Sequence, residues 1–112
     1  MESAAIAQRF VDGLNTFDLA GVRAMVTPDF EFTIGTHTAD RDDFLASLAT
    51  GPETDPEFRF AVDRIDGADV HGRQEYYWRE TGELATSAAR VLRLELDGDL
   101  IRRAVVDDAP KV

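Results

Sequence analysis

The sequence predicts an α+β domain in which a cone-shaped, curved antiparallel or mixed β-sheet wraps around three helices from the N-terminal half. Three helix-like segments come first, and a meander of strands follows from Val70 to Ala109. Within the meander, residues 91–96 alternate between apolar and polar side chains, and Asp97-Gly98 is typical of a tight hairpin. Helices followed by a curled sheet favour a pocket between the two layers. The predicted order is α-α-β-α-β-β-β-β.

The length and composition indicate one globular domain over residues 1–112. A chain of 112 residues is large enough to bury a core without covalent staples. Its 44% hydrophobic and 30% charged residues are ordinary for a globular protein. The chain has no cysteine, which excludes disulfides, thiolate metal sites and cysteine nucleophiles.

The charge balance limits the classes of partner. With 22 acidic and 12 basic residues the net charge is −10, which disfavours nucleic acid and anionic membranes. No stretch approaches the ~18 apolar residues of a membrane span. The first residues also lack the basic region of a secretory signal. We therefore expect a cytoplasmic protein with no nucleic-acid or membrane partner.

Each predicted helix has a capping residue. Ser3 is the candidate cap of a first helix that runs to about Asn15, with apolar residues on one stripe. Asp18 is the candidate cap of a short second helix, which ends before Pro28. Asp40 is the candidate cap of a third helix over residues 41–49.

Five strands are predicted from alternating or β-rich segments. Residues 30–34 alternate as a half-buried strand, and Gly35 releases the chain into a loop. Two further strands are expected at about residues 58–66 and 70–80. The Thr81-Gly82 turn leads into another strand, which ends at Leu96, and the last strand is expected at about residues 100–109. Residues 50–57 carry prolines and acids and indicate an exposed loop, one that can gate a pocket mouth.

Three segments resemble the nuclear transport factor 2-like superfamily, and more narrowly its SnoaL-like, polyketide cyclase-like branch. Residues 10–19 resemble the family's first helix and its turn into the second. Residues 27–32 resemble the entry into its first strand, and residues 91–102 resemble its closing hairpin. The resemblance covers nearly the whole chain and implies a single domain of this fold. It does not imply one function, because members include isomerases, cyclases, dehydratases, epoxide hydrolases and non-catalytic subunits.

Within this superfamily, ketosteroid isomerase uses an Asp base and an oxyanion hole made of a Tyr and a protonated Asp. The resemblance puts Phe10 at the position of that Tyr, Ile34 at the position of the base and Arg90 at the position of the second Asp. Phenylalanine cannot donate a hydrogen bond and isoleucine cannot accept a proton. Isomerisation by that proton shuttle is therefore not expected.

SnoaL-like polyketide cyclases use an acid on the final strand, and Asp107 lies on the final predicted strand here. Counting by twos, Arg103, Val105 and Asp107 share one face, which the resemblance makes the concave face together with Arg90. Asp107 is thus the candidate general acid/base, and Arg90 is the candidate cation that orients the ligand or stabilises negative charge. The alternatives are a solvated carboxylate and a structural salt bridge. A slip of one residue would turn Asp107 outward and Asp108 inward.

The aromatic run Tyr76-Tyr77-Trp78 on one strand alternates between the two faces of the sheet. We expect Tyr76 and Trp78 to line the pocket, and Tyr77 to lie on the outer face, where aromatic residues favour a homodimer interface. The alternative is plain core packing that leaves no cavity. The complete set of predicted pocket residues is Phe10, Ile34, Tyr76, Trp78, Arg90, Leu92, Arg103, Val105 and Asp107.

No metal or cofactor is expected. The two histidines, His37 and His71, are far apart in sequence and lack the spacing of a metal site. Histidine can, however, exchange protons near neutral pH. No glycine-rich phosphate loop or nucleophile elbow is present.

Two functional hypotheses follow. In the first, the chain is a SnoaL-like domain that binds a small, largely apolar molecule, as a cofactor-independent cyclase, isomerase or hydratase with an Asp acid/base. In the second, it is a non-catalytic domain for dimerisation through the outer sheet face or for effector binding. An open cavity containing both Arg90 and Asp107 would favour the first hypothesis, and a filled cone would favour the second.

Overall fold

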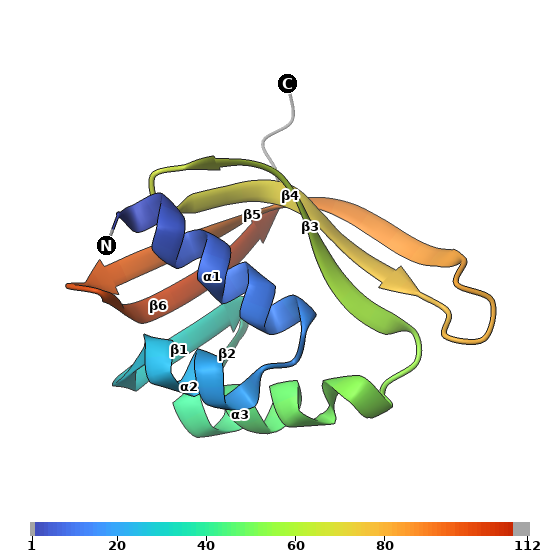
Figure 1. Cartoon of the computed structure of the whole chain (residues 1–112), viewed down its shortest axis with the longest axis horizontal. Coiled ribbons are helices and arrows are strands. Elements are labelled where there is room, and N and C mark those ends of the chain that lie inside the picture. The colour runs from blue at the N-terminus through green and yellow to red at the C-terminus, as the bar shows by residue number, and fades with distance from the viewer. Residues whose placement is uncertain (1, 109–112) are drawn as a thin grey trace.

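The computed structural model describes residues 2–108 and confirms the α+β architecture and the helix order (Figure 1). Its helices are α1 (Ser3–Asn15), α2 (Leu19–Met25) and α3 (Arg41–Thr50), and α3 continues into a 3₁₀ turn, η1 (Gly51–Glu53). Its strands are β1 (Val26–Ile34), β2 (His37–Asp40), β3 (Glu57–Asp66), β4 (Asp69–Tyr77), β5 (Leu84–Asp97) and β6 (Leu100–Asp108). Ala109, the last residue of the predicted meander, lies outside the described residues. No helix in residues 2–108 is long and apolar enough to cross a membrane.

The six strands form one mixed sheet in the order β2-β1-β6-β5-β4-β3. Neighbouring strands are antiparallel except for β1 and β6, which are parallel. Figure 1 shows α1 crossing one face of this curved sheet, with α2 and α3 alongside its β1–β2 end. Helices and sheet therefore form the two predicted layers.

Strand β2 was not predicted, because the sequence indicated a loop after Gly35. Gly35 adopts a left-handed conformation (φ 59°), and this tight turn returns the chain along β1, so that His37 pairs with Ile34. Most residues of this short edge strand are exposed, so it lacks the apolar alternation that marks a strand in sequence. Its presence brings His37 and Ala39 beside the inner face of β1.

Two of the three predicted caps are confirmed. The Asp18 carboxylate accepts a hydrogen bond from the Gly21 backbone N–H at 3.1 Å, and the Asp40 carboxylate accepts one from Asp43 at 2.8 Å. The first helix differs, because its N-cap is Glu2 and Ser3 is already helical.

Helix α1 ends in a Schellman motif whose left-handed residue is Phe17. The Asp18 N–H donates to the Gly13 carbonyl at 2.9 Å, and the Phe17 N–H donates to the Leu14 carbonyl at 3.3 Å. Phe17 has φ 52°, which costs about 1–2 kcal/mol for a residue other than glycine. This conformation sets the Phe17 ring against Gly51, where a Cβ atom would lie only 2.3 Å from a ring carbon. Gly51 is therefore required by close packing.

The core is built around phenylalanines from three elements. Phe10 of α1 is fully buried, and its ring centroid lies 6.4 Å from that of Phe30 on β1 and 6.2 Å from that of Phe44 on α3. Phe32 stacks on Phe44 with 4.8 Å between ring centroids. This aromatic cluster joins the helices to the β1 side of the sheet.

A β-bulge near the start of β6 changes which of its residues face the helices. Leu96 pairs with Ile101, whereas Glu95 pairs with Arg103, so Arg102 is an extra residue in β6. Beyond the bulge, Val106 pairs with the buried, inward Leu92. The alternate residues Arg103, Val105 and Asp107 consequently lie on the outer face, and the count by twos that placed them in the pocket was wrong.

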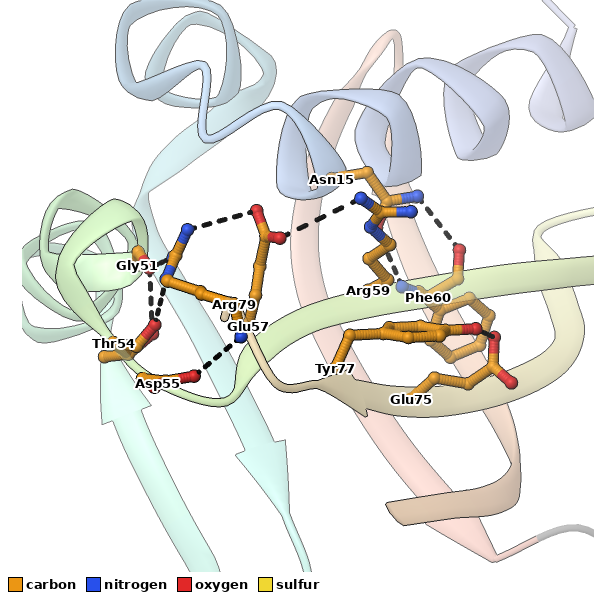
Figure 2. A network of polar contacts seen from close by, with 10 residues as sticks. All are labelled: Asn15, Gly51, Thr54, Asp55, Glu57, Arg59, Phe60, Glu75, Tyr77 and Arg79. Carbon is orange, nitrogen blue, oxygen red and sulfur yellow. Dashed lines mark hydrogen bonds and ion pairs between the residues drawn. The ribbon is translucent and has the colours of Figure 1, made fainter. Parts of the chain in front are cut away.

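Asn15 attaches the end of α1 to the free edge of the sheet. Its amide nitrogen donates to the Phe60 carbonyl at 2.9 Å, and its amide oxygen accepts from the Phe60 N–H at 2.7 Å (Figure 2). Strand β3 is the last strand of the sheet, so these backbone groups have no strand partner on that side. The Asn15 side chain thus pairs the Phe60 N–H and carbonyl, which would otherwise have no protein partner at the sheet edge.

We predict that Asn15→Ala lowers the free energy of unfolding by about 1–3 kcal/mol, because a part-buried backbone donor and acceptor lose their partners. Urea unfolding followed by circular dichroism measures this change. Gln8→Ala is the matched control, since Gln8 is an exposed amide on the same helix, and we expect a change within about 0.5 kcal/mol. Equal stabilities of the two variants would contradict the role given to Asn15.

Candidate functional site

A cavity of about 400 Å³ lies between the inner face of the sheet and the α1–α3–η1 side of the molecule. Most of its lining is apolar. The apolar lining side chains are Leu14, Phe17, Phe32, Ile34, Ala39, Phe44, Leu48, Pro56 and Phe58. A smaller cavity of about 40 Å³ adjoins it and is closed by Phe60, Leu92 and Val106. The aromatic cluster therefore fills only part of the space beneath the curved sheet.

Few polar groups reach the cavity. They are His37, Ser47, Thr54, Gln74 and Tyr76, together with the backbone of Gly51. No carboxylate of the described residues lines it. Residues 2–108 also contain no group of three His, Asp or Glu side chains that could hold a metal ion. The cavity is suited to a mainly apolar molecule that forms a small number of hydrogen bonds.

The polar groups on the inner face form a chain across three strands. The Gln74 amide nitrogen donates to the Tyr76 hydroxyl oxygen at 2.9 Å, and the Arg90 Nε donates to the Gln74 amide oxygen at 3.3 Å. Arg90 also forms an ion pair with Asp108, its cross-strand neighbour on β6. Gln74 and Tyr76 line the cavity, and Arg90 and Asp108 stand behind them toward solvent. The chain thus runs from an exposed carboxylate to a hydroxyl in the cavity.

Several predicted pocket residues lie at or next to this cavity. Ile34 and Tyr76 line it, and Leu92 lines the adjoining smaller cavity. Arg90 is one hydrogen bond away, through Gln74. Phe10 is different, because it lies within the aromatic cluster and is not part of the lining.

Trp78 does not line the cavity. Strand β4 ends at Tyr77, three residues before the predicted end, and residues 78–83 form the connection to β5. The turn is closed by the Trp78 N–H donating to the Glu83 carbonyl and by the Gly82 N–H donating to the Trp78 carbonyl, each at 2.8 Å. Because the chain has left the strand, Trp78 no longer follows the alternation, and 46% of its surface is exposed.

Asp107 lies on the outer face of the sheet and is half exposed. Its carboxylate pairs with the Nε of Arg93 at 3.1 Å, and the same guanidinium pairs with Asp69 at 3.0 Å. Asp108 takes the inner position opposite Arg90 that the sequence had suggested for Asp107. Arg90 and an acidic residue do meet, but on the rim of the site rather than in the cavity.

The resolved pKa shifts at the ends of the sheet also belong to the outer surface. The hydrogen bond from the Tyr77 hydroxyl to Glu75, at 3.0 Å, raises the pKa of Tyr77 above its ordinary value. The hydrogen bond and ion pair with Arg102 lower the pKa of Glu95. The Glu95–Arg102 pair lies on an exposed strand surface, whereas Glu75 is buried, and neither carboxylate lines the cavity.

Arg79 holds the segment that closes one side of the cavity (Figure 2). Its guanidinium donates to the Thr54 carbonyl at 2.6 Å and to the Gly51 carbonyl at 2.9 Å, and it pairs with Glu57 at 3.6 Å. Its backbone N–H donates to the Asp55 carboxylate at 3.0 Å. Because Gly51 and Thr54 line the cavity, the segment predicted as an exposed loop is a fixed part of its wall.

Sequence reasoning missed some of these residues for definite reasons. Gln74 was not predicted, although it is two residues before Tyr76 on the same strand, and the period-2 rule applied to Tyr76 could have found it. His37 lines the cavity because of the unpredicted strand β2. Arg79 binds mainly backbone carbonyls far away in sequence, and no local pattern marks such contacts.

Comparison with known proteins agrees with this architecture. The chain shares its fold with an NTF2-like protein of unknown function from Burkholderia pseudomallei, at a TM-score of 0.76 and 18% identity over 97% of this chain and 92% of that one. A protein with a ketosteroid isomerase-like fold from Catenulispora acidiphila was solved in complex with trimethylamine. Its TM-score is 0.73 and its identity 8%, over 93% of this chain and 85% of that one. TerC, co-crystallised with polyporic acid, has a TM-score of 0.74 and 16% identity over 96% of this chain and 91% of that one.

No protein with a curated description matches the chain significantly. A family model does match, however, and it covers residues 7–104 under the description SnoaL-like domain. That range runs from the first helix to the final strand and includes every element that borders the cavity. The chain therefore belongs to the SnoaL-like domain family.

Proposed function

We propose that this domain binds a compact, largely apolar small molecule in the cavity between the sheet and α3. The observation that carries the proposal is a cavity of about 400 Å³ with a mainly apolar lining and a few polar groups. Pockets for small molecules typically have this size and composition, in the range of roughly 300–1,000 Å³. The TerC and trimethylamine-complex structures, which share the fold, support a small organic molecule as the class of ligand.

A cofactor-independent cyclase, isomerase or hydratase activity would need an acid/base among the cavity residues. Asp107 is separated from the cavity by the thickness of the sheet, which argues against it as that group. His37 is the lining residue whose side-chain type exchanges protons near neutral pH. We infer that His37, rather than Asp107, is the candidate acid/base if the bound molecule is turned over, and that binding is the primary function.

We also propose that the outer face of the sheet forms a homodimer interface. Tyr77 and Val105 are half-buried apolar positions on this face, and the Arg59 guanidinium lies 5.3 Å from the centroid of the Tyr77 ring. Around them, Arg93 and Arg103 alternate with carboxylates, so that a second copy can present complementary charges. Aromatic and arginine residues are the types enriched at protein interfaces.

The cavity proposal is tested with the apolar fluorophore N-phenyl-1-naphthylamine and a variant that fills the space. We expect Ser47→Phe to weaken binding roughly tenfold, about 1.4 kcal/mol, because the new ring occupies the cavity from its α3 wall. Fluorescence titration gives both dissociation constants. Ala46→Phe is the matched control, since Ala46 is an exposed neighbour on α3 outside the lining. Failure of the natural chain to bind the fluorophore, or equal weakening by both variants, would contradict the proposal.

The wall held by Arg79 is expected to loosen in Arg79→Met. This change keeps a long side chain but removes the donors to Gly51 and Thr54, so local opening of residues 51–57 should become easier by about 1–3 kcal/mol. Hydrogen exchange measured by mass spectrometry reports this as faster exchange in that segment. Arg64→Met, at an exposed position on β3, should leave the exchange unchanged. Unchanged exchange in both variants would show that Arg79 does not fix the wall.

The dimer is tested by sedimentation velocity. We expect a dimer for the natural chain and a monomer for Val105→Arg, because the new cation lies opposite Arg93 in the centre of the outer face. Leu84→Arg changes charge equally at an exposed site near the β4–β5 connection and should remain dimeric. A monomeric natural chain would reject this interface.

A further inference from the structure

The polar chain beneath the sheet has a fixed direction, because a guanidinium can only donate hydrogen bonds. Arg90 Nε donates to Gln74 and therefore selects its amide oxygen as the acceptor. The amide NH₂ of Gln74 is then turned toward Tyr76 and donates to its hydroxyl oxygen at 2.9 Å. That bond uses the Tyr76 hydroxyl as an acceptor and leaves its proton available.

The available proton of Tyr76 has no acceptor within the described part of the chain. Tyr76 lines the cavity, and the only hydrogen bond of its hydroxyl among residues 2–108 is the one it accepts from Gln74. Its ring is held by edge-to-face packing on Phe58, with ring centroids 5.9 Å apart. A positioned donor of this kind requires an acceptor from a bound molecule or from water.

We propose that the Tyr76 hydroxyl donates a hydrogen bond to the bound molecule, and that the cavity prefers ligands with an acceptor oxygen such as a ketone carbonyl. This inference rests on the proposed ligand-binding function and adds a chemical class to it. At the other end of these hydrogen bonds, the ion pair with Asp108 fixes Arg90. The charge of Arg90 polarises the Gln74–Tyr76 hydrogen bond and makes the Tyr76 hydroxyl a stronger donor. The other side of the ligand meets apolar rings, chiefly Phe32, Phe44 and Phe58.

The inference is tested with 1-tetralone and tetralin, which share a ring system and differ in the carbonyl. Both are measured by displacement of N-phenyl-1-naphthylamine. We expect the natural chain to bind the ketone about three- to tenfold more tightly, the usual contribution of one net hydrogen bond. Tyr76→Phe should remove this preference while its affinity for tetralin stays the same. Thermal unfolding confirms that the variant is folded.

A second variant reverses the hydrogen bond between residue 74 and Tyr76 and keeps the one from Arg90. In Gln74→Glu the introduced carboxylate only accepts hydrogen bonds, so it takes one from Arg90 and one from Tyr76. The Tyr76 proton is then donated to the carboxylate of residue 74, and the Tyr76 hydroxyl oxygen can accept a hydrogen bond from a ligand. We expect the preference for 1-tetralone over tetralin to disappear and 1-tetralol, which carries a donor, to gain affinity relative to the ketone.

Gln8→Glu provides the same change of charge at the chain's other glutamine, which is exposed on α1, and should keep the ketone preference. Equal affinities of 1-tetralone and tetralin for the natural chain, or no displacement by the ketone, would overturn the inference. If N-phenyl-1-naphthylamine still binds in that case, the cavity proposal stands. Retention of the preference in Tyr76→Phe would overturn it as well. Absence of N-phenyl-1-naphthylamine binding to the natural chain would reject the proposed function and the inference together.

Discussion

The cavity exists because one short helix packs against a sheet that is much longer than the helix. Helix α1 has 13 residues, about 20 Å at 1.5 Å per residue, whereas the 14 residues of β5 measure roughly 45 Å along the curved strand. The aromatic cluster around Phe10 fixes the helix over one part of the concave face. The remaining part must be closed by α3, η1 and the segment attached to Arg79, which meet the sheet without filling the space beneath it.

The two faces of the sheet separate different kinds of chemistry. The outer face carries ion pairs such as Arg93–Asp69 and Arg93–Asp107, and exposed pairs of this kind contribute only about 0–1 kcal/mol each. The inner face is mainly apolar, and its polar groups include His37 and the hydrogen-bonded residues from Asp108 to Tyr76. Stability therefore comes mainly from the buried core. Under the proposed function, selectivity for a ligand depends on the shape of the cavity and on very few directed hydrogen bonds.

The parts of the fold that local patterns determine were predictable from the sequence. The helices have apolar stripes or capping aspartates, and the Asp97-Gly98 hairpin is confirmed, with Gly98 at φ 61°. Ile34, expected in the pocket from the family resemblance, and Tyr76, expected there from strand alternation, both line the cavity. The errors arose where nonlocal contacts determine the register or the ends of a strand. These places are the extra residue in β6, the early end of β4 and the exposed edge strand β2. Absence of a cofactor and a cytoplasmic location stay predictions.

The acidic pair at the end of β6 gives Arg90 a carboxylate partner with or without the bulge in that strand. With the bulge at Arg102, Asp108 stands opposite Arg90 and Asp107 faces outward. If Arg102 were paired and the bulge lost, the register beyond it would shift by one residue and place Asp107 opposite Arg90, so a carboxylate would still stand there. The ion pair of Arg90 is thus preserved in either register of β6. The anchor of the inner polar chain can persist through evolutionary changes that invert every other side chain beyond the bulge.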